Sequence, residues 1–382
     1  HRPPPMSKVV REIHNHFATV RDLSTRALEW MSRPSWLEFA PNNVCNLRCV
    51  MCAQADGLPV VAMKREEARR VLGEVLPHIS IWAPSALSEP LLADFKMVLQ
   101  ECRKHDVYLN MYTNATLTTG EKFREMADRV HKLHISFDSH VPEALTALRV
   151  RADYDQVVAN IKEILEIAAE QKIPVGFVVV LMKDTLPTLP EYVDFIADIG
   201  GAAAHVDIRC QPMLDNAEAC KGLVLEDSFT DEEICDYLDR AGARAMERKI
   251  NLHVHARAPL RRDFTPIEPF VRWIMPDVQQ RLMMEIQEQH PHFCYMAAIY
   301  MKIEPNGDVF PCCRGPEELK MGNTYDQSIE EIWNGERYQK LREQMHNSDY
   351  PEPCQGCDIM MSLPKFQEVV APKLKSGSTN GA

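Results

Sequence analysis

The sequence predicts an α/β protein in which a parallel sheet with helices outside it is followed by a small C-terminal module of a hairpin and a helix. Between residues 34 and 257, helical segments alternate with short and almost continuously apolar strands. Strands that are apolar on both faces are typical of parallel sheets covered by helices. After residue 288 this alternation ends, and a hairpin signal with further cysteines follows. A chain of 382 residues is long enough for one large and one smaller domain.

Composition argues against two kinds of partner. Asp and Glu outnumber Lys and Arg by 55 to 43, which gives a net charge of −12, whereas nucleic-acid-binding proteins usually carry a basic surplus. No apolar run reaches the length of a bilayer crossing. Twelve cysteines without a signal peptide indicate a reducing compartment. We therefore expect a cytoplasmic protein that binds neither nucleic acid nor membranes.

The elements of the large domain follow in order. Periodic apolar residues predict an N-terminal helix within 1–33, of which the first five residues, HRPPP, look like the remains of an expression tag. Expected strands cover 36–40, 79–83, 107–112, 133–137, 175–181 and 203–210, and expected helices cover 64–76, 91–105, 121–130, 154–171, 189–199 and 229–249. The Pro-punctuated segment 258–288 is expected to be a bridge or lid, or an ordinary packing insertion, and 362–382 a flexible tail.

A loop with three cysteines follows the first expected strand. Residues 41–54 read PNNVCNLRCVMCAQ, with Cys45, Cys49 and Cys52 in a C-x3-C-x2-C spacing. Three thiolates on one tight loop can hold three corners of a cubane iron–sulfur cluster and leave one iron open to a small molecule. The alternatives are buried or disulfide-bonded cysteines, or part of a zinc site, although zinc normally takes four closed ligands in paired knuckles.

This loop resembles the cluster loop of the radical S-adenosylmethionine (radical SAM) enzymes, down to the wording CNLRC.MC. The resemblance implies a partial (β/α)6 TIM-like barrel over 34–257 and a [4Fe–4S] cluster whose open iron chelates S-adenosylmethionine. It also implies an electron donor of the flavodoxin or ferredoxin type. The electron cleaves S-adenosylmethionine to methionine and a 5′-deoxyadenosyl radical, which abstracts hydrogen from the substrate.

The resemblance further assigns the polar ends of S-adenosylmethionine to two segments. Ser88-Glu89-Pro90 stands where relatives usually have Gly-Glu-Pro, so Glu89 and its backbone are expected to receive the methionyl ammonium. The Ser in place of Gly leaves the close backbone approach open. Arg149, or Arg151 just beyond it, is expected to pair with the methionyl carboxylate, because a guanidinium fork suits a carboxylate.

Three more residues at expected strand ends match the family's contacts to the rest of S-adenosylmethionine. Asn114 follows the third strand, and Ser136, with Asp138 nearby, resembles the segment that contacts the ribose. Leu181, together with Val179, is expected to pack against adenine. Each residue alone fits an ordinary turn or core position equally well.

The strand HVDIRC is the expected source of substrate contacts. Strand alternation places His205, Asp207 and Arg209 on one face, which points either into the barrel or towards an outer helix or solvent. Asp207 and Arg209 are therefore candidate catalytic residues, and His253 and His255 are further candidates for acid–base roles by position. Cys210 is the candidate thiol donor for an epimerase, with an inert buried thiol as the alternative.

The C-terminal module, 289–361, contains a second cysteine set. Cys294, Cys312, Cys354 and Cys357 are spaced C-x17-C-x41-C-x2-C. Between them lie an Asn-Gly hairpin signal at 306–307 and an expected helix over 328–346 that opens with a capping box. A closed four-thiolate site fits this arrangement, with zinc or an iron–sulfur cluster as the bound group.

The module resembles the SPASM or twitch modules of radical SAM proteins in its hairpin, the GN at 322–323, the EIW at 331–333 and the terminal C-x2-C. This resemblance favours an auxiliary [4Fe–4S] cluster over zinc. Full SPASM modules hold two clusters and need more cysteines after the C-x2-C, so a single cluster is expected. Cys313 is an alternative ligand to Cys312.

Single-cluster modules of this kind resemble those of the 2-deoxy-scyllo-inosamine dehydrogenases. The resemblance implies an oxidoreductase of natural-product biosynthesis that oxidises a carbinol of a sugar, cyclitol or similar small metabolite, or an epimerase. Peptide maturation is the alternative within enzymes. The N-terminal segment is expected to be too short for a separate leader-binding domain, which counts against this alternative without deciding it. A non-catalytic iron–sulfur scaffold or electron carrier is the alternative of another class.

Overall fold

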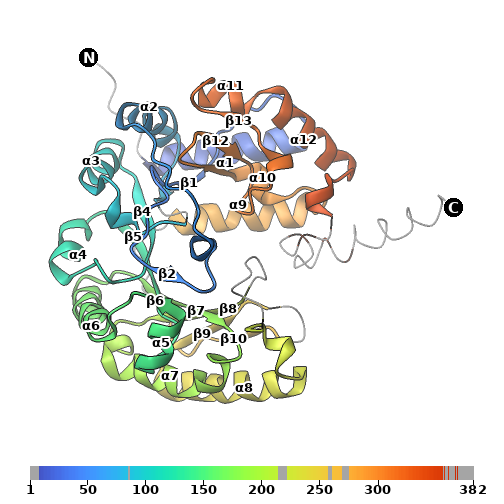
Figure 1. Cartoon of the computed structure of the whole chain (residues 1–382). Coiled ribbons are helices and arrows are strands. Elements are labelled where there is room, and N and C mark those ends of the chain that lie inside the picture. The colour runs from blue at the N-terminus through green and yellow to red at the C-terminus, as the bar shows by residue number, and fades with distance from the viewer. Residues whose placement is uncertain are drawn as a thin grey trace.

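The computed structural model describes residues 8–84, 87–213, 222–256, 260–268, 275–355, 357, 360, 366 and 368. Within these residues the centre of the molecule is one sheet of eleven strands (Figure 1). In spatial order the strands are β10 (Arg262–Phe264), β9 (Asn251–Val254), β8 (Asp207–Pro212), β7 (Val175–Leu181), β5 (Val130–Ser136), β4 (Tyr108–Thr113), β3 (Ile81–Ala83), β1 (Trp36–Phe39), β11 (Tyr300–Ile303), β12 (Asp308–Phe310) and β13 (Gly322–Asn323). Neighbouring strands from β9 to β11 are parallel, which confirms the predicted α/β barrel-type fold.

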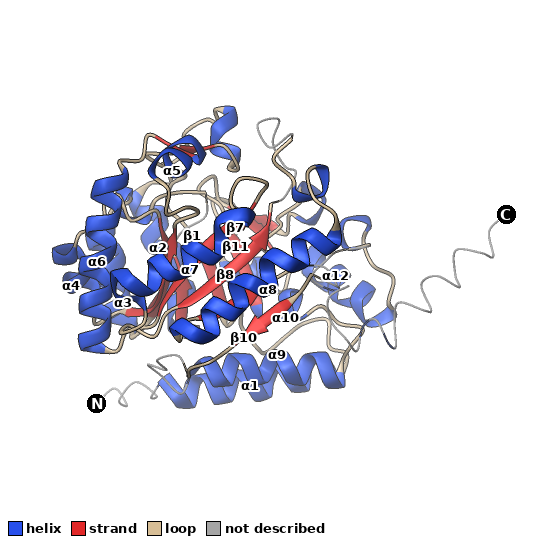
Figure 2. Ribbon diagram, turned by 90° about the horizontal axis from the view of Figure 1, so that it is seen from below, coloured by secondary structure: helices blue, strands red, loops and turns tan. Residues whose placement is uncertain are grey.

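Helices follow most of the strands of the large domain and cover the outside of the sheet (Figures 1 and 2). They are α2 (Arg65–Val75), α3 (Phe95–His105), α4 (Gly120–Met126), α5 (Pro142–Leu148), α6 (Tyr154–Gln171), α7 (Leu189–Ile196) and α8 (Asp231–Arg248). The rest of the chain adds α1 (Lys8–Ser24), α9 (Met275–Gln289), α10 (Tyr295–Ile299), α11 (Ile329–Trp333) and α12 (Glu336–Asn347). A two-stranded ribbon pairs β2 (Arg48–Cys49) with β6 (Arg149–Val150). None of the described helices combines the length and hydropathy that a membrane crossing requires.

The two faces of the sheet differ in chemistry. Phe137, which follows β5, contacts the rings of Tyr192 and Phe195 on α7, so the face that Phe137 shares with Phe177 packs against the helices. The opposite face is the interior of the barrel and carries polar side chains on β4, β5 and β8. An outer apolar core therefore leaves the inner face available for a polar site.

Two expected helices differ from the structure for tertiary reasons. The N-terminal helix ends at Ser24, because the chain then folds back and the Asp22 carboxylate accepts a hydrogen bond from the backbone N–H of Ser32 at 2.9 Å. The expected helix 328–346 is two helices, α11 and α12. Between them Asn334 accepts from the backbone N–H of Trp30 at 2.8 Å and donates to its carbonyl at 3.0 Å.

The expected bridge segment 258–288 is described in part. β10 extends the sheet by pairing antiparallel with β9. α9 packs against α1, and His16 of α1 and Glu285 of α9 are 2.7 Å apart. The described parts therefore belong to the sheet edge and to a packed helix, and the remainder lies outside the described residues. So do the first seven residues and, apart from residues 366 and 368, the expected tail.

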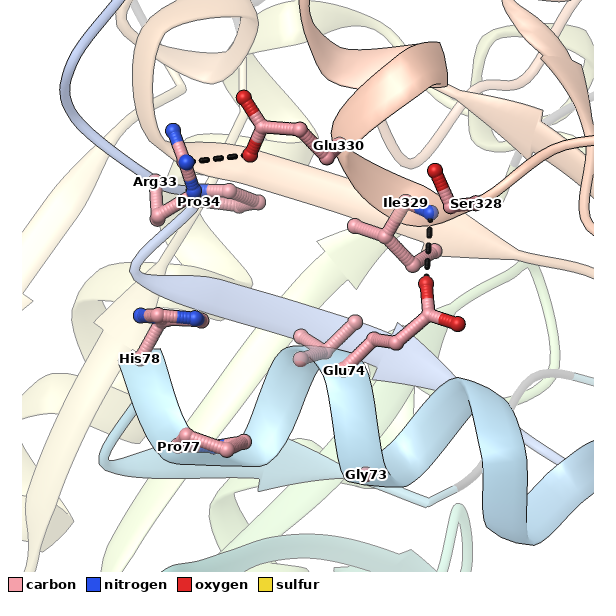
Figure 3. A pocket seen from close by; sticks show the side chains of 10 residues that line it. Arg33, Pro34, Gly73, Glu74, Pro77, His78, Ser328, Ile329 and Glu330 are labelled. Atoms are coloured by element: carbon pink, nitrogen blue, oxygen red, sulfur yellow. Dashed lines mark hydrogen bonds and ion pairs between the residues drawn. The ribbon is translucent and has the colours of Figure 1, made fainter.

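The C-terminal module is joined to the large domain at two places. β11 pairs with β1, so the sheet continues across the expected domain boundary. At α2, the carboxylate of Glu74 accepts from the backbone N–H of Ile329 at 2.8 Å, and Arg33 forms an ion pair with Glu330 beside it (Figure 3). A pocket lies between these two contacts.

Substitution of Gly242 in α8 tests the packing of that helix against β10 at the sheet edge, and Gly73 in α2 is the control. A Cβ at Gly242 in α8 would overlap the ring of Phe264 in β10, whereas a Cβ at Gly73 in α2 meets no atom within 4 Å. We expect Gly242→Ala to lower the free energy of unfolding by about 1–3 kcal/mol. Gly73→Ala should raise it by up to about 1 kcal/mol through helix propensity. Urea denaturation of the anaerobic apoprotein measures both, and equal effects at the two sites would contradict the described β10–α8 contact.

Candidate active site

Cys45, Cys49 and Cys52 lie on the loop after β1, and none forms a disulfide. The backbone N–H of Cys52 donates to the carbonyl of Cys49 at 3.0 Å, which closes a tight turn. Burial raises the pKa of Cys45 and raises that of Cys49 to about 11. No three His, Cys, Asp or Glu side chains of the described residues converge as ligands of a single metal ion.

N–H donors point at two of the three sulfurs. The Cys45 Sγ accepts from the backbone N–H of Leu47 at 3.5 Å and from the Asn114 amide at 3.9 Å. The Cys49 Sγ accepts from Arg149 at 3.6 Å. Such donors stabilise thiolates, the form in which cysteine ligates iron. The loop therefore fits the predicted cluster.

Buried hydrogen bonds hold this loop against the segment after β3. The side chain of Gln54 is buried and donates to the carbonyls of Asn43 at 2.6 Å and Leu87 at 2.9 Å. The backbone N–H of Glu89 donates to the carbonyl of Val44 at 2.9 Å. Gln54 was not singled out from the sequence, although it belongs to the motif.

Glu89 connects the cysteine loop to the end of β4 by hydrogen bonds. Its carboxylate is 1% exposed and accepts from the Thr113 hydroxyl and from the backbone N–H of Asn114, both at 2.9 Å. Burial raises the pKa of Glu89 to about 7, and these hydrogen bonds partly offset that effect. Both carboxylate oxygens thus already hold the protein together, and binding of the methionyl ammonium by Glu89 stays a prediction.

Asn114 braces the same loop from β4. Its side-chain NH2 group donates to the side-chain oxygen of Asn46 at 3.0 Å and to the Cys45 sulfur, and its own side-chain oxygen accepts from the backbone N–H of Thr116 at 2.9 Å. The residue therefore lies at the cluster loop, as the resemblance implies, with its hydrogen bonds directed to the protein.

Arg149 lies beside the cysteine loop. β6 pairs with β2 so that Arg149 lies opposite Cys49. Its guanidinium is buried and lies 2.7 Å from the Asp138 carboxylate, whose other oxygen accepts from the backbone N–H of Val180 at 2.8 Å. Its charge is thus paired with Asp138 beside the Cys49 sulfur, and pairing of Arg149 with the methionyl carboxylate stays a prediction.

Leu181 lies on the face of β7 that packs against the helices, and its contact with adenine stays a prediction. In the β7–β8 register Val179 lies beside Cys210 and Leu181 beside Pro212, on the face that packs against the helices. Val180 points the other way and forms a small apolar cluster with Leu148, Met182 and Met213, against Val50 and Met51 of the cysteine loop. Ser136 ends β5 on the interior face, where a ribose contact stays a prediction.

The candidate substrate residues on and before β8 do not all lie on the same face of the sheet. Asp207 and Arg209 lie on the interior face, and Asp207 forms an ion pair with Lys132 of β5 at 2.9 Å. His205 does not join them, because it lies in a turn before the strand with φ 51°. Cys210 is fully buried on the helix side near Tyr192, so it is not placed to deliver hydrogen into the interior.

Arg209 lies in a polar cluster that includes residues not singled out from the sequence. Tyr112 of β4 is hydrogen-bonded to Arg209, and its ring stacks on His134 of β5 at 4.3 Å. Arg209 forms no ion pair with a carboxylate of the described residues. In the next strand His253 pairs with Arg209 in register and contacts Asp263 at 2.9 Å. The alternation of polar residues in YLNMYT could have revealed Tyr112.

The C-terminal cysteines form a second site. Cys294, Cys312, Cys354 and Cys357 line one pocket whose other lining residues are mostly Met, Leu, Ala and Pro. Cys313 is exposed and does not line it, which favours Cys312 over Cys313 as the ligand. Backbone N–H groups of Met296 and Ala297 point at the Cys294 sulfur, and those of Arg314 and Gly315 at the Cys312 sulfur. Four thiols with such donors fit a four-thiolate cluster.

Family comparisons agree with both cysteine sites. Residues 40–196 match the model described as the radical SAM superfamily, and residues 294–358 match SPASM, an iron–sulfur cluster-binding domain. The chain carries a radical SAM domain followed by an SPASM domain. These domains imply [4Fe–4S] clusters, and the radical SAM superfamily consists of enzymes.

Solved structures share this fold. Streptococcus suis SuiB bound to S-adenosylmethionine is 15% identical with a TM-score of 0.60, over 91% of this chain and 76% of that one. anSMEcpe with bound AdoMet is 16% identical with a TM-score of 0.57, over 87% and 85%. BtrN in complex with AdoMet and 2-DOIA has a TM-score of 0.41, too low to distinguish activities. A comparison with curated proteins gave no match.

The ion pair beside Cys49 is testable. Because Asp138 and Arg149 are both buried, we expect Arg149→Met or Asp138→Asn alone to lower the free energy of unfolding by about 3–5 kcal/mol, and the double variant to cost clearly less than the sum. Denaturation of the anaerobic apoprotein measures the cycle.

The exposed neighbour Arg151 serves as the control for this cycle, and Arg151→Met should stay within about 0.5 kcal/mol of the wild type. Additive single effects would show that the two charges do not depend on each other.

Proposed function

We propose that this protein is a radical SAM enzyme that oxidises a carbinol of a polar small metabolite, such as a sugar or cyclitol. The observation that carries the proposal is the polar interior face, where Tyr112 of β4, His134 of β5 and Arg209 of β8 lie together. Such a face can recognise several hydroxyl groups by hydrogen bonds. The described interior face also offers no thiol, which favours oxidation over thiol-dependent epimerisation.

The chain's own residues divide the work of recognition and proton transfer. Arg209, supported by Tyr112, binds and orients the substrate through charge-assisted hydrogen bonds. Asp207 forms an ion pair with Lys132 and stabilises the interior face on which the site lies. His253, oriented by Asp263, accepts the hydroxyl proton, since a histidine held by a carboxylate is a common general base.

Oxidation of a carbinol removes a carbon-bound hydrogen atom, a hydroxyl proton and one further electron. S-adenosylmethionine and the N-terminal cluster supply the hydrogen acceptor, and the cluster bound by the C-terminal cysteines is the acceptor for the electron. The loop residues Gln54, Glu89 and Asn114 keep the three-cysteine loop rigid against the barrel during this chemistry.

Peptide modification is the second candidate. Its support is that SuiB has been solved bound to the precursor peptide SuiA and anSMEcpe bound to the Cp18Cys peptide, both with folds similar to this chain. Parallel assays of C-deuterated polyols and of peptides discriminate the two, because only the true substrate class transfers deuterium to 5′-deoxyadenosine.

Arg209 provides the sharpest variant. With reconstituted protein, we expect Arg209→Met to lower kcat/KM for the deuterated polyol by about 10–100-fold, the loss of one charge-assisted interaction. Substrate-independent cleavage of S-adenosylmethionine should remain as in the wild type. Mass spectrometry of 5′-deoxyadenosine measures both reactions.

Arg240→Met on the surface of α8 is the matched control and should change neither reaction. Absence of S-adenosylmethionine cleavage in the wild type would instead support a non-catalytic iron–sulfur protein. Deuterium transfer from polyols that is insensitive to Arg209→Met would remove Arg209 from the site.

A further inference from the structure

Tyr338 lies beside the C-terminal cysteine pocket, and nothing above assigns it a role. In α12 it shares one face with Leu341 and Met345, at i+3 and i+7, and these two residues line the pocket of the four cysteines. The Cys312 thiol acts on Tyr338 electrostatically and adds to the burial that raises its pKa. Tyr338 thus lies one helical turn before the residues of α12 that line the pocket.

The hydroxyl of Tyr338 lacks an acceptor. The side chain is 0% exposed, and its oxygen has no hydrogen-bond partner among the described residues. Leaving a buried hydroxyl unpaired costs about 1–3 kcal/mol, so proteins rarely do so. Its place beside four cysteines indicates that the missing acceptor belongs to the group that those cysteines hold.

Arg342, one turn further along α12, adds a positive charge behind the Tyr338 ring. Its guanidinium is fully buried and lies over the rings of Trp30, Trp333 and Tyr338 at 4.3, 4.7 and 5.3 Å. One of its nitrogens, Nη1, donates to the carbonyl of Leu28 at 2.8 Å and to Asn334 at 3.1 Å.

The other two guanidinium nitrogens of Arg342, Nε and Nη2, have no partner in the described part of the chain. Burial lowers the pKa of Arg342 to about 9, so the group is still charged at neutral pH. No carboxylate of the described residues forms an ion pair with it. The Asp22 carboxylate acts on Arg342 electrostatically but is itself paired with Arg21 at 2.7 Å. A buried cation without a carboxylate in contact is costly, which indicates that negative charge arrives with the bound group.

We propose that Tyr338 donates a hydrogen bond to a sulfide of the auxiliary cluster, and that Arg342 strengthens this donor. This inference rests on the proposed single cluster at Cys294, Cys312, Cys354 and Cys357. Reduction adds one negative charge to a cluster. A hydrogen-bond donor and a cation stabilise the reduced form more than the oxidised form, and they raise the reduction potential. Tyr338 and Arg342 are therefore positioning residues that make the cluster a better electron acceptor.

The test measures the auxiliary cluster alone. In full-length protein with Cys45, Cys49 and Cys52 changed to Ala, redox titration followed by EPR gives the midpoint potential. We expect Tyr338→Phe to raise the ratio of oxidised to reduced cluster at a fixed potential about tenfold, a shift of about 59 mV for a one-electron couple. The exposed Tyr325→Phe in the same module is the matched control and should leave the ratio unchanged.

Arg342 gives a second, independent pair of variants. Arg342→Met should shift the potential in the same direction, and Arg342→Lys, which keeps the charge, should shift it less. If Tyr338→Phe fails to retain iron, the Arg342 pair decides by itself. The inference is overturned if Tyr338→Phe and Arg342→Met both keep the ratio of oxidised to reduced cluster, at the fixed potential, within twofold of the wild-type ratio. If the midpoint potential shifts as expected but the protein oxidises no polyol, this inference stands and the proposed function is wrong.

Discussion

The pairing of β1 with β11 is the constraint on which the rest of the structure depends. β1 leads into the three-cysteine loop, and β11 lies between Cys294 and Cys312 in the chain. Their parallel register runs from Trp36 opposite Tyr300 to Phe39 opposite Ile303. The Tyr300 hydroxyl donates to the Glu38 carboxylate across this pair, and burial raises the pKa of Glu38. One strand pair therefore sets the relative position of both cysteine sites, and the contacts of α2 with the α11 segment keep it from hinging.

Around each cysteine site the protein supplies N–H donors to sulfur. At the first site Arg149 donates to Cys49 while Asp138 balances its charge. At the second, backbone N–H groups point at Cys294 and Cys312 within an apolar pocket. A polar barrel interior lies on the other side of the sheet from the apolar core. The molecule thus combines two environments suited to electron transfer with one suited to binding a polar substrate.

Much of this could be predicted from the sequence, because cysteine spacing and the alternation of helices and strands are local signals. The α/β fold and the two cysteine sets follow from such signals, and Tyr154–Gln171 and Val175–Leu181 have the predicted bounds. What the sequence left open is the direction in which side chains point. β7 is buried on both faces, so its sequence does not tell whether Val180 or Leu181 points to the cysteine loop. Cys210 and Arg149 raise the same difficulty, since only the strand register and the β2–β6 ribbon place them. The aromatic rings around the Arg342 guanidinium include Trp30 and Trp333, which are about 300 positions apart in the sequence. No local pattern reveals such a contact.

The most direct test of the central claim, two separate cluster sites on one continuous sheet, is an iron and sulfide count after anaerobic reconstitution. We expect about eight irons per chain in the wild type and about four when Cys45, Cys49 and Cys52 are changed to Ala. We also expect about four when Cys294, Cys312, Cys354 and Cys357 are changed instead. About zero iron in the first variant would leave the C-terminal cysteines to another group and contradict the account. About eight in that variant would mean a two-cluster C-terminal module and contradict it equally.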